Sequence, residues 1–134
     1  MFADLHLHTT ASDGIYAPAE VVKLAKDKGY TAIAITDHDS TEGLTEALSA
    51  GEKIGMEVIP GIELSTLDDD REIHIIGYYP DPKSIALQDV ISKMIEARQN
   101  RAEKMVEKLN YLGYDILLPR VKEIAGSQYI VVRI

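Results

Sequence analysis

Hydrophobic residues in the first 80 positions fall into short runs that alternate with amphipathic segments. The short runs are rich in β-branched residues and predict strands at 2–8, 31–36, 56–64 and 71–79. We expect the third strand to be broken or bulged near Pro60 and Gly61. Apolar residues at helical spacing predict helices over 18–29 and 40–55, and Pro18 suits the first turn of the earlier helix. This alternation is typical of an α/β fold with parallel strand pairing.

The C-terminal part of the chain has a different pattern. Apolar positions recur at helical spacing from 84 to about 112, and Gly113 follows them as a stop signal. A short helix is predicted near Pro119, and the apolar segment 129–134 is typical of a strand. We therefore expect one long helix after the fourth strand.

Composition limits the chemistry that this chain can perform. Its 134 residues suit one domain with a modest core, and no apolar run approaches the ~18 residues of a membrane span. The N-terminus lacks a signal-peptide pattern, so we expect a cytoplasmic protein with no membrane partner. There is no cysteine, so any metal must be held by histidine and carboxylate side chains. The net charge of −8 disfavours general nucleic-acid binding.

All four histidines of the chain belong to the predicted strands or directly follow them. His6 and His8 lie on one face of the first strand, about 7 Å apart along it, and at this spacing their ring nitrogens can converge on one ion. His38 directly follows the second strand, and His74 lies inside the fourth. Because isoleucines flank His74, a histidine without a metal role remains an open alternative there.

Carboxylates follow the same strands. Asp37 comes after the second strand and Glu63 after the third. The carboxyl ends of parallel strands form one face of an α/β fold, so we expect these side chains to meet the histidines there. Histidine and carboxylate together suit divalent metals. We interpret Asp39 as a helix cap, and Ser40 or Thr41 is a further candidate for that cap.

Four segments together carry a resemblance to a known family. They are "DLHLHTTASDG" at 4–14, "ITDHDS" at 35–40, "GIELS" at 61–65 and "EIHIIGYY" at 72–79. In this order and at these separations they resemble the metal motifs of the polymerase and histidinol phosphatase (PHP) family, in particular its small stand-alone metal-dependent phosphoesterases. The resemblance implies a distorted (β/α)7 barrel, of which this chain would hold the N-terminal part with a long helix after the fourth strand.

The resemblance also implies metal ligands and up to three ions of Mn, Fe, Zn or Mg at the rim of the barrel. His6 and His8 resemble the ligands of one ion. Glu63 resembles the carboxylate that bridges this ion to a second, and His74 resembles a ligand of that second ion.

Two further positions match the ligands of a third ion in the family. These are Asp13 and His38, and Asp13 stands where some relatives have histidine, which favours harder ions. Asp37 matches no ligand of the family. We expect it to support a ligand through a hydrogen bond.

The activity that the resemblance implies is hydrolysis of a phosphate ester by metal-activated water. The substrate would be a nucleotide, a short oligonucleotide or a small metabolite such as histidinol phosphate. Arg98 and Arg101 match arginines near the cleft of relatives and would meet the substrate phosphate. The alternative is a solvated helix face that carries pairs of Glu and Arg.

The chain departs from the family after its long helix, because a Gly-Arg-Pro-His segment and a later Asp-x-His pair do not follow. A closed barrel takes about 250 residues. We expect residues 1–80 to form an N-terminal half-barrel with the metal motifs, and 81–134 a long helical segment and truncated remainder. Open sheet edges predict a homo-oligomer. The alternative functions are a catalytically weak or inactive metal-binding or oligomeric module, and a proofreading or regulatory domain detached from a polymerase.

Overall fold

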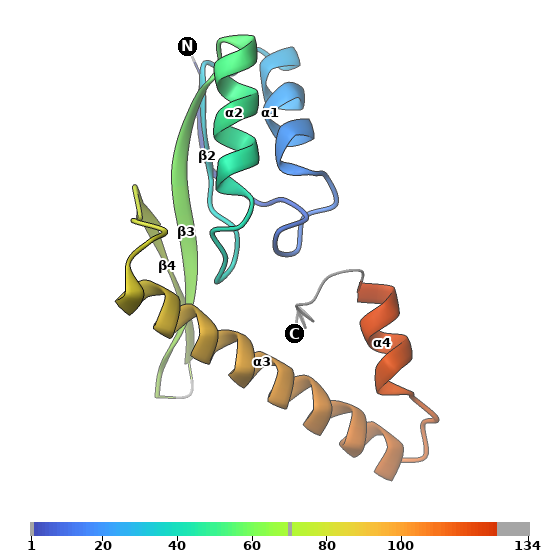
Figure 1. Ribbon diagram of the computed structural model, residues 1–134. Helices are drawn as coiled ribbons and strands as arrows, with labels where there is room; N and C mark the ends of the chain where they lie inside the picture. The colour runs from blue at the N-terminus through green and yellow to red at the C-terminus, as the bar shows by residue number, and fades with distance from the viewer. Residues whose placement is uncertain (1, 70, 126–134) are drawn as a thin grey trace. The chain divides into compact units, whose positions relative to one another are not determined.

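The computed structural model describes residues 2–69 and 71–125. The described residues belong to two compact units, Met1–Ser84 and Ile85–Ile134. The first unit contains strands and two helices, and the second contains helices among its described residues (Figure 1).

The first unit is built on a sheet with its strands in chain order: β1 (Ala3–Leu7), β2 (Ala32–Ile35), β3 (Glu57–Asp68) and β4 (Arg71–Tyr78). β1, β2 and β3 are parallel, as predicted, but β4 is antiparallel to β3. The prediction of parallel pairing is therefore wrong for β4. The reason is the short connection from Asp68 to Arg71, because a parallel pair needs a crossover of a dozen or more residues.

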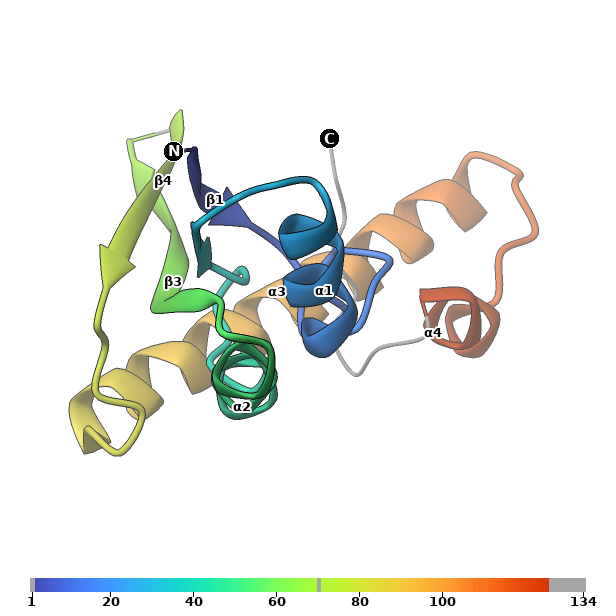
Figure 2. The same ribbon diagram turned by 90° about the horizontal axis from the view of Figure 1, so that it is seen from above.

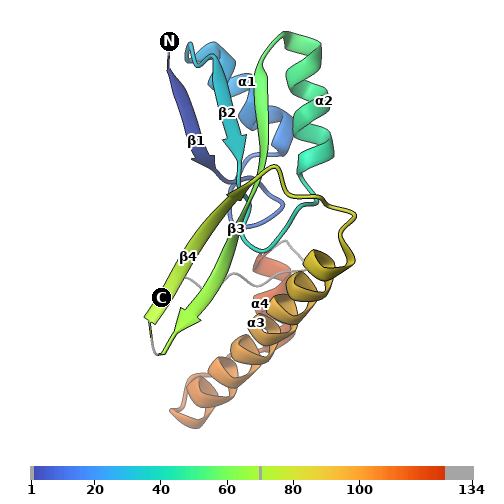
Figure 3. The same ribbon diagram turned by 90° about the vertical axis from the view of Figure 1, so that its left-hand side faces the viewer.

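β3 changes its pairing partner along its length, as Figure 3 shows. Residues up to Pro60 pair with β2, and residues from Gly61 onward pair with β4. The predicted break is thus a change of partner within one continuous strand. Gly61 is needed at this point because a Cβ there would lie 2.8 Å from Thr36 Cγ2 and 3.1 Å from Ile35 O. The second half of β3 consequently links the end of β2 to β4.

The two helices of the first unit cover one face of the sheet (Figure 1 and Figure 2). They are α1 (Pro18–Asp27) and α2 (Leu44–Ile54). The core between the helices and the sheet contains Val21, Val22, Ala25, Ile33, Ile35, Leu44, Ala47 and Met56. Pro18 begins α1 and Gly29 follows its end with φ of 85°, as the sequence predicts. The apolar side chains of the helices and strands fill this core, and polar side chains lie in the loops that follow β1 and β2.

α2 begins later than the sequence predicts. Its N-cap is Gly43, and no side chain caps the helix through a hydrogen bond. Ser40 Oγ instead accepts a hydrogen bond from Glu42 N at 3.3 Å, inside the turn that precedes the helix. The predictions that Asp39, Ser40 or Thr41 caps this helix are therefore wrong, because the chain completes a separate turn before it becomes helical.

The second unit contains α3 (Ile85–Tyr111) and α4 (Leu118–Ala125), which confirm the predicted long helix and the short helix near Pro119. The Asn110 side chain closes the connection between them, because it accepts a hydrogen bond from Ile116 N and donates one to Ile116 O, both at 2.9 Å. Among residues 2–69 and 71–125, no helix combines the length and apolar character needed to cross a bilayer. The strand predicted at 129–134 lies outside the described residues.

Candidate metal centre

His6 and His8 come together at the end of β1. The pairing register between β1 and β2 shifts between Asp4 and Leu7, so the strand is irregular where the histidines lie. Their Nε2 atoms are 3.0 Å apart, and their ring centroids are 5.0 Å apart. The two rings therefore approach each other closely, as the His-x-His spacing predicts.

Glu63 lies at the centre of the histidines and is 3% exposed. Its Oε2 lies 2.7 Å from His6 Nε2 and 3.1 Å from His8 Nε2. Its Oε1 lies 2.8 Å from His74 Nδ1, across the β3–β4 pair. The sequence predicts Glu63 at the end of the third strand or directly after it, whereas it lies well inside β3, just beyond the change of partner. One carboxylate thus contacts histidines from two strands and the segment that follows β1.

His38 and Asp13 complete the cluster from the loops after β2 and β1. His38 forms an isolated parallel bridge with Glu63, and its Nδ1 lies 3.7 Å from Glu63 Oε2. His38 stacks on His8 with ring centroids 4.6 Å apart. The other ring nitrogen of His8, Nδ1, lies 3.5 Å from Asp13 Oδ1. All six predicted ligands therefore lie in one continuous cluster.

Three groups within this cluster have ligand atoms that all lie within 4.8 Å of one another. The groups are His6, His8 and Glu63; His8, Asp13 and His38; and His38, Glu63 and His74. We call them the β1 group, the loop group and the hairpin group. His8 belongs to the first two, and His38 belongs to the last two. The cluster is thus arranged around shared residues.

The donor set fits divalent metal ions. His8 Nδ1 and His38 Nδ1 are buried and have no hydrogen-bond partner among the described residues. Buried polar atoms are costly unless they are paired, so their convergence with carboxylate oxygens favours a cation between them. Nitrogen and oxygen donors without sulfur suit ions such as Zn, Fe and Mn, and carboxylates extend the set towards Mg.

The surroundings of His38 and Glu63 shift their pKa values in the directions that favour cation binding. Burial lowers the pKa of His38 below its ordinary value, although the nearby Glu63 carboxylate opposes this effect. Burial raises the pKa of Glu63, but the hydrogen bond with His6 and the positive charges of His38, His6 and His8 together outweigh it. The pKa of Glu63 therefore lies below its ordinary value. A neutral imidazole and an ionised carboxylate are the forms that bind metal.

Asp37 is buried behind the cluster and is 1% exposed. Its Oδ1 accepts hydrogen bonds from Thr9 N at 2.7 Å and Ser12 Oγ at 2.6 Å, and its Oδ2 accepts one from Thr9 Oγ1 at 2.8 Å. The sequence predicts a supporting hydrogen bond to a ligand. The bonds of Asp37 go instead to the loop that separates His8 from Asp13.

Asp39 contacts the opposite side of the cluster. Its N–H donates to Glu63 O at 2.9 Å, and its Oδ1 accepts a hydrogen bond from Ser65 N at 2.8 Å. Sequence reasoning missed this role and those of Thr9 and Ser12. A signal was present, because "DHD" places a carboxylate on each side of a predicted ligand.

The two predicted phosphate-binding residues lie on α3, in the second unit. Arg98 is half-buried and Arg101 is exposed. The structure brings the six predicted ligands together, all within the first unit. The role of the two arginines stays a prediction.

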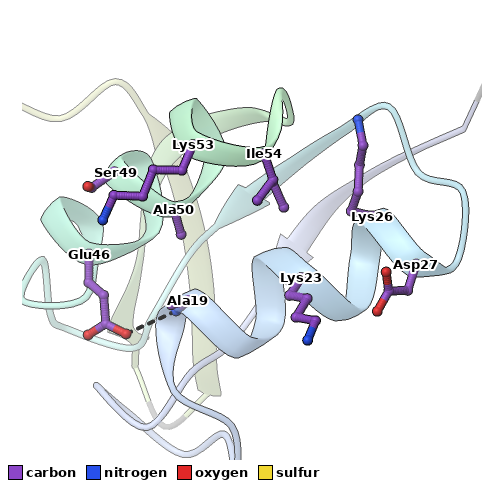
Figure 4. Close-up of a pocket in the computed structure, with 9 residues that line it drawn as sticks. All are labelled: Ala19, Lys23, Lys26, Asp27, Glu46, Ser49, Ala50, Lys53 and Ile54. Carbon is purple, nitrogen blue, oxygen red and sulfur yellow. Dashed lines mark hydrogen bonds between the residues drawn. The ribbon is translucent and has the colours of Figure 1, made fainter.

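A groove of about 480 Å³ lies on the outer surface between α1 and α2. Figure 4 shows Lys23, Lys26 and Lys53 around it, with the hydrogen bond from Ala19 N to Glu46 Oε1 at one end. Lys26 Nζ also donates to Gly55 O at 2.8 Å, which ties the ends of the two helices together. No predicted site residue lines this groove, so the chemistry of the chain is centred on the cluster and not on this concave surface.

The fold and the cluster together define a class: α/β proteins that gather histidine and carboxylate ligands at the ends of parallel strands. The chain belongs to the PHP domain family, whose profile matches residues 4–128. This match confirms the family resemblance seen in the four sequence segments.

The chain is similar to several known members. It is 34% identical over 125 residues to the 5′-3′ exoribonuclease of Haemophilus influenzae, covering 93% of this chain and 46% of that protein. It is also 34% identical over 129 residues to the phosphoribosyl 1,2-cyclic phosphate 1,2-diphosphodiesterase of Eggerthella lenta, covering 95% of this chain and 49% of that protein.

A solved structure confirms the predicted fold. It is a protein from Bifidobacterium adolescentis assigned as a metal-dependent phosphoesterase, with a TM-score of 0.86 and 32% identity, over 96% of this chain and 45% of that one. The chain therefore has the α/β fold of the N-terminal part of a PHP-type barrel. It spans about half the length of the relatives that it matches.

Proposed function

We propose that this chain provides a metal-binding part of a metal-dependent phosphoesterase, with six of the metal ligands within residues 1–80. One observation carries the proposal: six side chains form one continuous cluster that includes the buried carboxylate of Glu63. The six residues are His6, His8, Asp13, His38, Glu63 and His74. The names of the two relatives, an exoribonuclease and a cyclic phosphate diphosphodiesterase, support cleavage of phosphate diesters.

The ligands are assigned to up to three divalent ions of Mn, Fe, Zn or Mg. His6 and His8 would hold one ion, Glu63 would be shared between this ion and a second, and His74 would help to hold the second. Asp13 and His38 would hold the third. Asp37 supports this third site through the loop that carries Asp13.

Divalent ions supply two effects in such a site: they acidify a bound water, and they neutralise charge on phosphoryl oxygens. The protein's own residues keep the site in the correct ionisation state. Burial raises the pKa of Glu63, but the hydrogen bond with His6 and the nearby histidines hold it below the ordinary value, which favours the carboxylate form; burial lowers the pKa of His38, which favours its neutral form. Arg98 and Arg101 are proposed to bind the substrate phosphate as charged donors.

The proposed substrate is a small phosphorylated molecule: a nucleotide, a short oligonucleotide or a metabolite phosphate. The charge of −8 disfavours a long polyanion, because the chain lacks an overall basic surface. A homo-oligomer is the proposed assembly, since β1 and β4 form the edges of the described sheet.

Hydrolysis of bis-p-nitrophenyl phosphate after supply of Mn²⁺ tests the proposal. We expect activity that a chelator removes and that His8→Ala abolishes. Glu57→Gln is a matched control, because Glu57 is an exposed acid at the start of the strand that carries Glu63. Metal binding without hydrolysis would favour the metal-binding module instead. Absence of bound metal would overturn both functions.

A further inference from the structure

We infer that Asp37 and Asp39, which flank His38 in the sequence, are positioning residues for the two ligand groups that share His38. The inference rests on the proposed metal-binding function. It assigns each carboxylate to a different group: Asp37 to the loop group and Asp39 to the hairpin group.

Asp37 fixes the loop that leads from His8 to Asp13. Thr9 directly follows His8, and Ser12 directly precedes Asp13. The three hydrogen bonds of Asp37, at 2.6 to 2.8 Å, hold this segment at both ends. Thr9 is 0% exposed and Asp37 is 1% exposed, so water does not compete for these bonds. Hydrogen bonds to an ionised carboxylate are about twice as strong as those between neutral groups.

Asp39 extends the pairing between the end of β2 and β3. Glu63 N donates to Asp37 O at 3.1 Å, and Asp39 N donates to Glu63 O at 2.9 Å. The next donor along β3, Ser65 N, reaches Asp39 Oδ1 at 2.8 Å. The side-chain oxygen therefore takes the place of a backbone carbonyl. This arrangement holds the backbone of Glu63 on both sides.

The hydrogen bond from Ser65 N to Asp39 Oδ1 also affects the placement of His74 in the hairpin group. Ser65 is the pairing partner of His74 in the β3–β4 register. By fixing Ser65, Asp39 fixes the position of the strand pair that presents Glu63 and His74 to His38. Asp39 has φ of 50°, a conformation that asparagine and aspartate tolerate better than most residues and glycine adopts freely. The position therefore uses both the backbone conformation of Asp39 and its side-chain oxygen.

Two substitutions of Asp39 separate these requirements. Asp39→Asn keeps a side-chain oxygen for Ser65 N, whereas Asp39→Gly keeps the backbone conformation and removes the oxygen. We expect Zn²⁺ affinity of the hairpin group to fall at least about tenfold in Asp39→Gly, the usual size of effect for a residue that supports a ligand. Asp39→Asn should stay within about threefold of the unchanged protein, because the supporting hydrogen bond remains.

Titration of the whole chain with Zn²⁺, followed by the side-chain NMR signals of the four histidines, gives the required readout. In Asp39→Gly the His74 signals should respond only at higher Zn²⁺, while the His6 signals should respond as in the unchanged protein. A general loss of structure would weaken every site equally. Equal affinities of the Gly and Asn variants, or an equal loss at His6 and His74, would overturn the role of Asp39.

Ser12→Ala tests Asp37 from the donor side, since it removes one of the three hydrogen bonds and leaves the carboxylate in place. We expect weaker Zn²⁺ binding at His8 Nδ1 in the loop group, with the His74 signals unchanged. An unchanged loop group would overturn the role of Asp37. If the unchanged protein binds no Zn²⁺, the proposed function fails. If it binds Zn²⁺ and all the variants match it, only this inference fails.

Discussion

At the scale of single residues, Glu63 is the side chain on which the cluster depends. Its two oxygens contact different histidines, and it belongs to both the β1 group and the hairpin group. The histidines keep its pKa low despite burial, so it enters the cluster as a charge. Removal of that charge should affect two groups at once.

Glu63→Gln should therefore lose more bound metal than Asp39→Asn. The amide carries no charge to attract two cations, whereas Asp39→Asn keeps its hydrogen bond to Ser65 N. Elemental analysis after supply of Mn²⁺ or Zn²⁺ measures the loss. Glu57→Gln should retain the full metal content, because Glu57 is exposed at the start of β3. Equal metal loss in the Glu63 and Asp39 variants would contradict the central role of Glu63.

His38 should titrate below its ordinary pKa of 6.5 in the metal-free protein, because burial disfavours its charged form. In the unfolded chain, His38 has its ordinary pKa of 6.5. As the pH falls, the unfolded chain therefore takes up this proton at a higher pH than the folded protein does. This residue therefore lowers the free energy of unfolding as the solution becomes acidic. Histidine NMR signals followed against pH give the value. A midpoint for His38 at or above 6.5 would show that the nearby carboxylates outweigh burial.

At the scale of elements, the partner change in β3 decides where the ligands lie. The first part of β3 packs beside β2, and the second part carries Glu63 between the end of β2 and β4. Gly61 allows the two backbones to approach at the change of partner. A side chain at this position would push β3 away from β2.

Gly61→Ala should consequently lower the free energy of unfolding by about 1–3 kcal/mol, because the added Cβ meets Thr36 Cγ2 at 2.8 Å. Gly77→Ala is the matched control on β4, where the nearest atom to an added Cβ is Ile62 Cγ2 at 3.8 Å. That change should stay within about 0.5 kcal/mol of the unchanged protein. Chemical denaturation measures both values. Similar effects of the two substitutions would mean that the close approach at Gly61 is not maintained in solution.

At the scale of the whole molecule, the sheet has two edges among the described strands. β1 and β4 each pair with one neighbour, and β4 exposes Ile73 and Ile75 by 42% and 53%. Unpaired edges with apolar side chains are surfaces on which a second chain can add strands. These features predict self-association through β4.

Light scattering at increasing protein concentration should therefore show an oligomer. Ile75→Lys should reduce association, because a charged side chain on an edge strand opposes pairing. Ile15→Lys is the control, since Ile15 is 82% exposed in a loop and outside any strand. A monomer at all concentrations would contradict the prediction. An equal effect of the two lysine substitutions would place the contact elsewhere.

Local signals were enough to predict most of the elements. The helices from Pro18 and Ile85 and all four strands follow from periodicity, proline and glycine, which act through the conformations of neighbouring residues. The six candidate ligands were also found from motifs, because their residue types and order are visible along the chain. The start of α2 was misplaced, since the segment after β2 is held by contacts with β3 that no local pattern contains.

Most of the elements, the family resemblance and the set of candidate ligands can thus be read from the amino-acid sequence. The way these residues are shared depends on the folded sheet: His8 and His38 each join two groups, β4 turns back antiparallel, and Asp39 binds Ser65 instead of capping a helix. The physical reason is that hydrogen bonds between strands and loops join residues far apart in the chain. Their geometry exists only once the sheet has formed, because each donor and acceptor is placed by a different strand.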